Sequence, residues 1–141
     1  MATMEYVRRG SVLIVVHSSA APTATEWKRF AEDYRRDRAS LTRMYVHTNG
    51  GGPSSSQRRE IADAMGDVPL RAVVLTDSLV VRGIVTAMSW LKGDFMRAFS
   101  QKDSDGAMRY LDISAAERLE ILNVVHSSLA RLNQNKSANA A

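Results

Sequence analysis

The sequence predicts a single α/β domain built on a mixed, mostly parallel sheet of about five strands, with helices packed on it and an additional C-terminal helix. Three observations indicate this class. Short β-branched or apolar runs alternate with amphipathic stretches, loops rich in glycine and serine separate them, and a length of 141 residues suits one domain. We therefore expect one domain over residues 1–132, followed by small polar residues, 133–141, that form a disordered tail.

The first half of the chain reads as a hairpin followed by two units of strand and helix. Strands are predicted over 5–8 and 11–17, because a turn at Arg9 and Gly10 separates two apolar runs. A helix over 25–38 carries apolar residues at three- and four-residue spacing. A strand over 41–47, the glycine-rich loop 49–56 and a short helix over 57–65 follow it.

The second half continues the alternation and then adds a long helix. The expected elements are a buried strand at 70–76, a helix at 79–92, a last strand at 95–99 and a short helix at 103–111. Ser114 and Glu117 fit a capping box, which opens the C-terminal helix. Its apolar stripe is expected to comprise Leu119, Leu122, Val125, Leu129 and Leu132.

Four segments of the chain carry a resemblance to a known family. The hairpin at 6–15, the strand, loop and helix at 45–61, and the strand and helix segments at 73–83 and 99–111 are similar to successive parts of the STAS domain family. The likeness is to its bacterial branch, which is related to anti-sigma-factor antagonists, and it covers roughly residues 4–112. The resemblance implies a STAS-like fold and a regulatory or scaffolding role through protein–protein contact, without turnover.

The glycine-rich loop, Asn49 to Gln57, raises the question of a phosphate site. It has no lysine for a P-loop, and its glycines are contiguous rather than spaced as in a dinucleotide fingerprint. The first interpretation is a turn whose serine caps the next helix. The second is anion binding or a phosphoserine, with Arg58 as the pairing cation. The candidate serines are Ser54, Ser55 and Ser56.

Polar side chains stand at the ends of three predicted strands. His17 and His47 each end a strand, and Asp77 and Ser78 follow another. Parallel strands bring these residues to the carboxyl edge of the sheet, where ligands bind in open α/β folds. An alternative function is therefore a small-molecule or anion-binding module at this edge. A second alternative is a small hydrolase that uses Ser, His and Asp, although the nucleophile-elbow motif is absent. The histidine spacing does not indicate a metal site.

The helix over 79–91 is apolar almost all round, with Arg82 as the charged exception. A surface helix shows one apolar stripe, so this helix requires cover on two sides. Either the C-terminal helix or a second copy of the chain is expected to supply that cover. In a homodimer the interface candidates are Val81, Ile84, Val85, Met88 and Trp90.

Charge and composition narrow the classes of partner and compartment. The net charge of +4 comes from arginines spread along the chain and mixed with acidic residues, so nucleic-acid binding is not expected. The chain has no cysteine, its N-terminus lacks a secretory signal, and its longest apolar stretch is too short to cross a bilayer. We expect a cytoplasmic, bacterial protein with a protein partner, without a cofactor and without membrane association.

Overall fold

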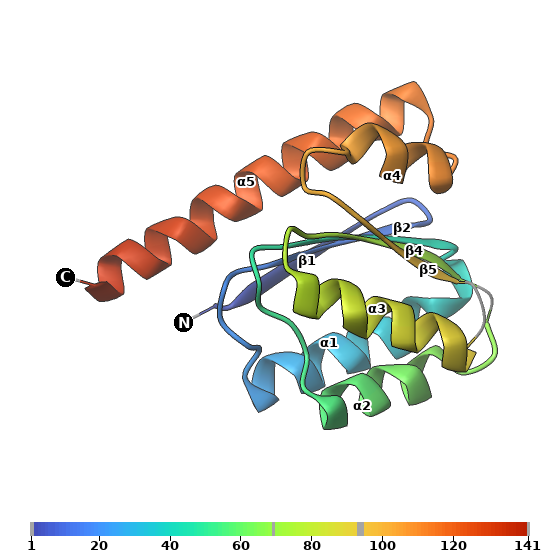
Figure 1. Cartoon of the computed structure of the whole chain (residues 1–141), viewed down its shortest axis with the longest axis horizontal. Helices are drawn as coiled ribbons and strands as arrows, with labels where there is room; N and C mark the ends of the chain where they lie inside the picture. The colour runs from blue at the N-terminus through green and yellow to red at the C-terminus, as the bar shows by residue number, and fades with distance from the viewer. Residues whose placement is uncertain (1, 69, 93–94, 141) are drawn as a thin grey trace.

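A five-stranded sheet separates two layers of helices in the computed structural model, which describes residues 2–68, 70–92 and 95–140 (Figure 1). The strands are β1 (Met4–Arg9), β2 (Val12–His17), β3 (Arg43–Thr48), β4 (Arg71–Leu75) and β5 (Met96–Phe99). The helices are α1 (Ala24–Asp37), α2 (Ser55–Met65), α3 (Leu79–Lys92), α4 (Ser104–Tyr110) and α5 (Ala115–Ala140).

The sheet has the strand order β1-β2-β3-β4-β5, with β1 antiparallel to β2 and each later pair parallel. This arrangement confirms the predicted fold class. All six residues of β2 are buried, because helices cover both faces of the central strands. Alternate side chains of each strand therefore enter two separate cores, one on each face of the sheet.

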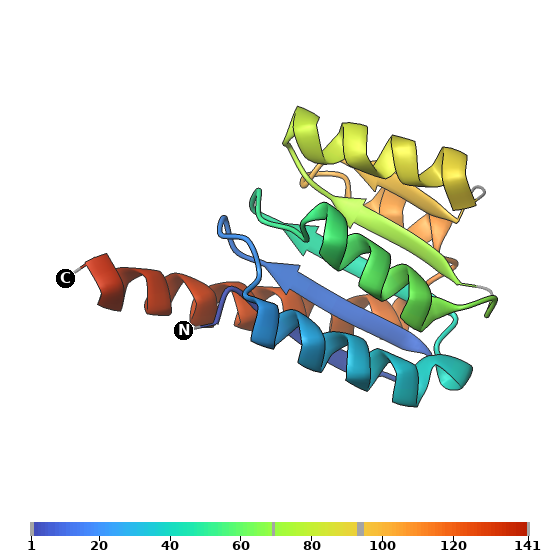
Figure 2. The ribbon, with the colours of Figure 1, turned by 90° about the horizontal axis from the view of Figure 1, so that it is seen from below.

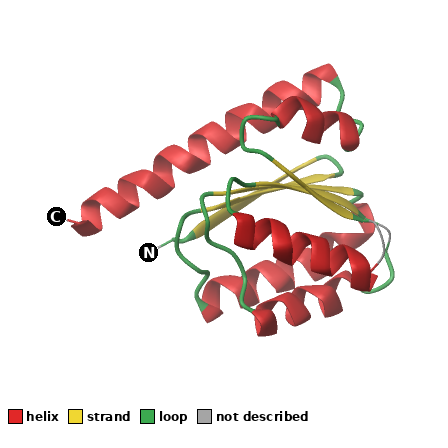
Figure 3. Cartoon of the chain, viewed as in Figure 1, coloured by secondary structure: helices red, strands yellow, loops and turns green. Residues whose placement is uncertain are grey.

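Helices α1, α2 and α3 cover one face, and α4 and α5 cover the other (Figures 1 and 3). The α1 helix buries Trp27, Phe30, Ala31 and Tyr34, which recur at the spacing of one helical face. Seen from the side of these three helices, α1, α2 and α3 lie next to one another across the sheet (Figure 2). The helix α2 packs beside α1, whereas α3 packs over β5.

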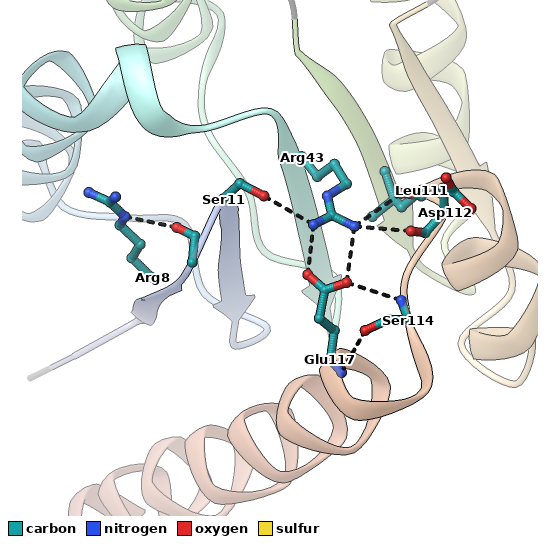
Figure 4. A network of polar contacts seen from close by, with 8 residues as sticks. Arg8, Ser11, Arg43, Leu111, Asp112, Ser114 and Glu117 are labelled. Carbon is teal, nitrogen blue, oxygen red and sulfur yellow. Dashed lines mark hydrogen bonds and ion pairs between the residues drawn. The ribbon is translucent and has the colours of Figure 1, made fainter.

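The start of α5 is fixed to the sheet by Arg43 (Figure 4). The guanidinium of Arg43 donates to Glu117 at 2.6 Å, to Ser11 Oγ at 3.0 Å and to the Asp112 carbonyl oxygen at 3.1 Å. The Ser114 and Glu117 capping box forms as the sequence predicts, through bonds of 3.0 and 3.2 Å. Hydrogen bonds from Ser114 and Arg43 lower the pKa of Glu117 and keep this carboxylate charged.

Two expectations about the helices are wrong. First, α5 lies on the face opposite α3 and does not cover it (Figure 1). Second, the buried stripe of α5 is Ile121, Val125, Ser128 and Leu132, while Leu119 and Leu122 are 64% and 41% exposed. The helix α5 extends to Ala140, and the expected disorder of residues 133–141 stays a prediction. A helix that is already formed extends through Asn, Gln, Lys and Ser at small cost, because propagation needs no new nucleus.

Candidate ligand-binding site

A cavity of about 230 Å³ lies between the sheet and the helices α1, α2 and α3, and we name it the α2–α3 cavity. It forms because α3 packs over β5 rather than against α2. The residues that line it are almost all apolar, and four of the chain's seven methionines are among them. The lining includes Val15, His17, Trp27, Phe30, Met44, Val46, Thr48, Gly51, Arg58, Ile61, Met65, Val74, Val81, Ile84, Val85, Met88 and Met96.

The glycine-rich loop borders this cavity and is held by backbone contacts. Gly51 N donates to the Ser18 carbonyl oxygen at 2.9 Å. A side chain at Gly51 would overlap the Ala20 carbonyl oxygen, so only glycine lets the two loops approach this closely. The Thr48 hydroxyl donates to the Gly51 carbonyl oxygen and accepts from Gly50 N at 3.1 Å. The first interpretation of the loop, a structured turn between a strand and a helix, agrees with this geometry.

Ser54 caps α2, as the sequence predicts for one of the loop serines. Its hydroxyl accepts from Gln57 N at 3.3 Å, and the Gln57 side chain accepts from Ser54 N at 2.9 Å. Ser55 and Ser56 are exposed in the first turn. Arg58 donates to the Pro53 carbonyl oxygen at 3.0 Å and so closes this end of the loop. Modification of these serines stays a prediction.

Two polar side chains of the cavity lining are buried, Thr48 at 2% and His17 at 4% exposed. The His17 ring stacks on Trp27 with centroids 6.3 Å apart. Trp27 is itself held by a 2.8 Å bond from Nε1 to the Gln57 carbonyl oxygen. Among the described residues, His17 Nδ1 has no hydrogen-bond partner. Burial lowers the pKa of His17 to about 4, so the ring is neutral at pH 7.

His17 and His47 end neighbouring strands but face opposite sides of the sheet. Leu13 and Val15 precede His17 on the face of α1, α2 and α3, whereas Tyr45 precedes His47 on the face of α4 and α5. The expectation that both histidines join one site is therefore wrong. Burial lowers the pKa of His47, and its hydrogen bond with the Asn49 side chain and the Asp77 charge oppose that shift.

Asp77 and Ser78 border a separate polar recess of about 170 Å³ at the carboxyl edge of the sheet. The Asp77 carboxylate accepts from Ser100 Oγ and Gln101 N, both at 3.2 Å. The Ser78 hydroxyl accepts from Val81 N at 3.3 Å and caps α3. Within the described residues, Ser78 does not hydrogen-bond a histidine, and the negative charge of the Asp77 carboxylate beside the recess disfavours an anion.

The predicted interface residues of α3 face the cavity more than the solvent. Val81, Ile84, Val85 and Met88 all line it, and Val85 is only 4% exposed. Among the described side chains of this helix, the large apolar ones that are exposed are Leu79 and Val80, at 85% and 74%. The side chain of Trp90, the fifth candidate, lies outside the described residues. The role of α3 in a dimer stays a prediction.

Sequence patterns predicted His17 and Arg58 as site residues but did not predict the cavity. The lining comes from four strands, three helices and a loop, and no local motif joins them. The sequence contained one signal of the cavity, which is the apolar surface all round α3. A helix of this kind can pack on the sheet with one side and line a cavity with another.

In the described part of the chain, no group of three His, Asp or Glu side chains is placed to hold a metal ion. The helices described there are also too short or too polar to cross a membrane.

Comparison with models of known protein families and with curated proteins finds no match. A solved structure is similar, however: the crystal structure of an uncharacterised protein of the DUF3478 family, with a SpoIIAA-like fold, from Shewanella loihica PV-4. The TM-score is 0.58 at 11% sequence identity, over 77% of this chain and 91% of that chain. At this identity the likeness concerns the fold. The chain therefore has a SpoIIAA-like fold, which is the STAS-like architecture that the sequence resemblance implied.

Proposed function

We propose that this protein is a non-enzymatic regulatory module that binds a small, mainly apolar molecule in the α2–α3 cavity. The observation that carries the proposal is an apolar cavity of about 230 Å³ whose lining includes the rings of Trp27 and Phe30 and four methionines. Protein interiors are close-packed, and an empty cavity costs stability. A large apolar pocket with few polar groups is the usual form of a small-molecule site.

Turnover is not part of the proposal, because the candidate catalytic groups are dispersed. His17 and His47 lie on opposite faces, and the Ser78 hydroxyl caps a helix. A nucleophile and its base must lie within hydrogen-bond reach of each other. The regulatory role rests on the fold resemblance and on α3, which forms one wall of the cavity and also presents apolar side chains to solvent.

A pair of tryptophan variants on α3 tests the proposal. Ile84→Trp places a larger side chain in the cavity wall, and Thr86→Trp places it on the exposed side of the same helix. We expect toluene, indole or octanoate to raise the melting temperature of the wild type and of Thr86→Trp, because ligands stabilise the state that they bind. We expect no rise for Ile84→Trp. Equal rises in both variants, or none in the wild type, would contradict the proposal.

A second candidate function is docking of a protein on the first turn of α3. The observation that favours it is the exposure of Leu79 and Val80, two large apolar side chains next to each other. If the partner is a second copy, sedimentation should give twice the 15.6 kDa chain mass, and Leu79→Glu should return the monomer. A wild-type monomer at high protein concentration would exclude the homodimer.

A further inference from the structure

The two ends of the α2–α3 cavity have different linings, and the inference drawn from this difference rests on the proposed function. Helices α2 and α3 run alongside the strands (Figure 2), so the cavity extends from one edge of the sheet toward the other. At the carboxyl edge its lining includes Thr48, Arg58, Ser78 and the glycine-rich loop. The other end, where β4 and β5 begin, is lined by apolar side chains: Met65, Leu70, Ala72, Met88 and Met96. A molecule that fills the cavity therefore meets polar groups at one end.

Arg58 lies on the face of α2 that lines the cavity. Arg58, Ile61 and Met65 follow the i, i+3, i+7 spacing of one helical face, and all three belong to the lining. Side chains of a helix lean toward its N-terminus, and Arg58 Nη1 donates to the Pro53 carbonyl oxygen at 3.0 Å. Since Pro53 also lines the cavity, the guanidinium lies where the glycine-rich loop meets it.

The charge of Arg58 is not neutralised by the protein. Among the described residues, no carboxylate forms an ion pair with its guanidinium, and Pro53 is the hydrogen-bond partner of its side chain. A guanidinium carries five N–H donors, so others remain for a ligand. Asp77 borders the neighbouring recess rather than the cavity, and its carboxylate accepts from Ser100 and Gln101. This end of the cavity therefore suits an anion.

The cavity is elongated along the strands and helices that line it. Arg58 and Met65 are about 10 Å apart along the axis of α2, at 1.5 Å per residue. Leu70 and Val74, which line the cavity along β4, are about 13 Å apart at 3.3 Å per residue. A slender chain fits this shape, with its polar group beside Arg58 and its apolar end near Met65.

We propose that the α2–α3 cavity binds an amphipathic anion, a straight-chain carboxylate of medium length, with its carboxylate on Arg58 and its chain directed toward Met65. Burial of the chain supplies most of the affinity, about fourfold for each methylene. The flexible methionines of the lining adapt to the chain. Arg58 supplies the preference for an anion and fixes the direction in which the chain lies.

Octanoate and octanamide test the role of Arg58, because they share one chain and nearly one shape, while only octanoate is charged at neutral pH. Titration calorimetry should show that the wild type binds octanoate about fivefold more tightly, the value of a partly exposed charge-assisted hydrogen bond. Arg58→Gln should bind both probes equally, whereas Arg58→Lys keeps the charge and should retain a preference for octanoate. The matched control is Arg59→Gln, which removes an exposed arginine of the same helix and should keep the fivefold preference.

Chain length tests whether the chain enters the cavity. Hexanoate should bind to the wild type about tenfold more weakly than octanoate, because two methylenes fewer are buried. An anion held by Arg58 at the surface alone would bind with the same affinity whatever its chain length. Equal binding of hexanoate and octanoate would therefore overturn the proposal.

Each other outcome has a distinct meaning. Equal binding of octanoate and octanamide by the wild type, or binding of toluene or indole without octanoate, would overturn the carboxylate ligand while leaving the cavity as a site. Loss of the preference in Arg59→Gln would overturn the role of Arg58 in favour of net charge. Binding of none of these probes would contradict the proposed function itself. Octanamide binding shows that Arg58→Gln retains a folded cavity, and the wild-type comparisons decide the proposal without this variant.

Discussion

At the scale of single residues, His17 stands out because its Nδ1 atom is buried without a hydrogen-bond partner among the described residues. A buried polar atom without a partner costs about 1–3 kcal/mol. Its neighbours Val15 and Val16 are apolar and fully buried, and an apolar residue at position 17 would continue their pattern. A polar residue that interrupts an apolar, buried pattern in this way is expected more often at a functional site than elsewhere.

Replacing this histidine with leucine should stabilise the ligand-free protein. We expect His17→Leu to raise the free energy of unfolding at pH 7.5 by about 1 kcal/mol, because the unpartnered nitrogen is removed and the side-chain volume is nearly kept. Urea denaturation gives this value. The matched control is His47→Leu, which loses the hydrogen bond with Asn49 and should not gain stability.

The same variant should also change how stability depends on pH. Burial lowers the pKa of His17 to about 4 in the folded protein, against 6.5 for an unperturbed histidine, with the Glu26 charge opposing the shift. The unfolded chain therefore binds more protons between pH 6.5 and 4, and stability is lost as pH falls through this range. From pH 7.5 to 5 the loss due to His17 is about 2 kcal/mol. An equal loss in His17→Leu would show that other groups cause it.

At the scale of elements, the glycine-rich loop illustrates how two adjacent glycines have different roles. A Cβ at Gly51 would overlap the Ala20 carbonyl oxygen and lie 2.5 Å from that of Ser18, whereas a Cβ at Gly52 would meet nothing within 4 Å. We expect Gly51→Ala to destabilise the protein by about 2–3 kcal/mol, because the two loops must separate. Gly52→Ala should change stability by less than about 0.5 kcal/mol. Similar effects of both variants on thermal unfolding would contradict this account of the loop.

The elements themselves were largely predictable from the sequence, because their patterns are strong. Apolar runs bounded by Gly10 and by the loop 49–56 marked the strands, and capping residues such as Ser114 marked helix starts. The buried stripe of α5 was less predictable. Both Leu119 and Ile121 suit a helix–sheet contact, and the angle at which α5 crosses the sheet decides between them. That angle depends on long-range contacts such as Arg43 with Glu117, which local patterns do not contain.

At the scale of the whole molecule, the two faces of the sheet differ in how they are packed. The face of α4 and α5 holds a core in which Val73, Ala107 and Met108 are fully buried. The other face leaves the α2–α3 cavity because α3 rests on β5. The ligand binding that we propose therefore belongs to the face of α1, α2 and α3.

The candidate site was only partly predictable, for a physical reason. Parallel strands end at the same edge of a sheet, so the sequence predicted that His17, Asp77 and the glycine loop lie near one another at that edge. The face on which each of these residues lies was not predictable, because β2 is apolar at every position before His17 and shows no alternation of apolar and polar residues. The cavity depends on where α3 comes to rest on the sheet, which only the three-dimensional packing determines.

Methionine methyl NMR tests the central claim most directly, that a small molecule occupies the α2–α3 cavity. With 13C-methyl methionine and saturating octanoate, we expect the resonances of Met44, Met65, Met88 and Met96 to shift, because these side chains line the cavity. Met108, buried in the core on the opposite face, serves as the internal control and should not move. Shifts confined to Met108, or no shifts at saturating concentrations of octanoate, octanamide, toluene or indole, would contradict the account.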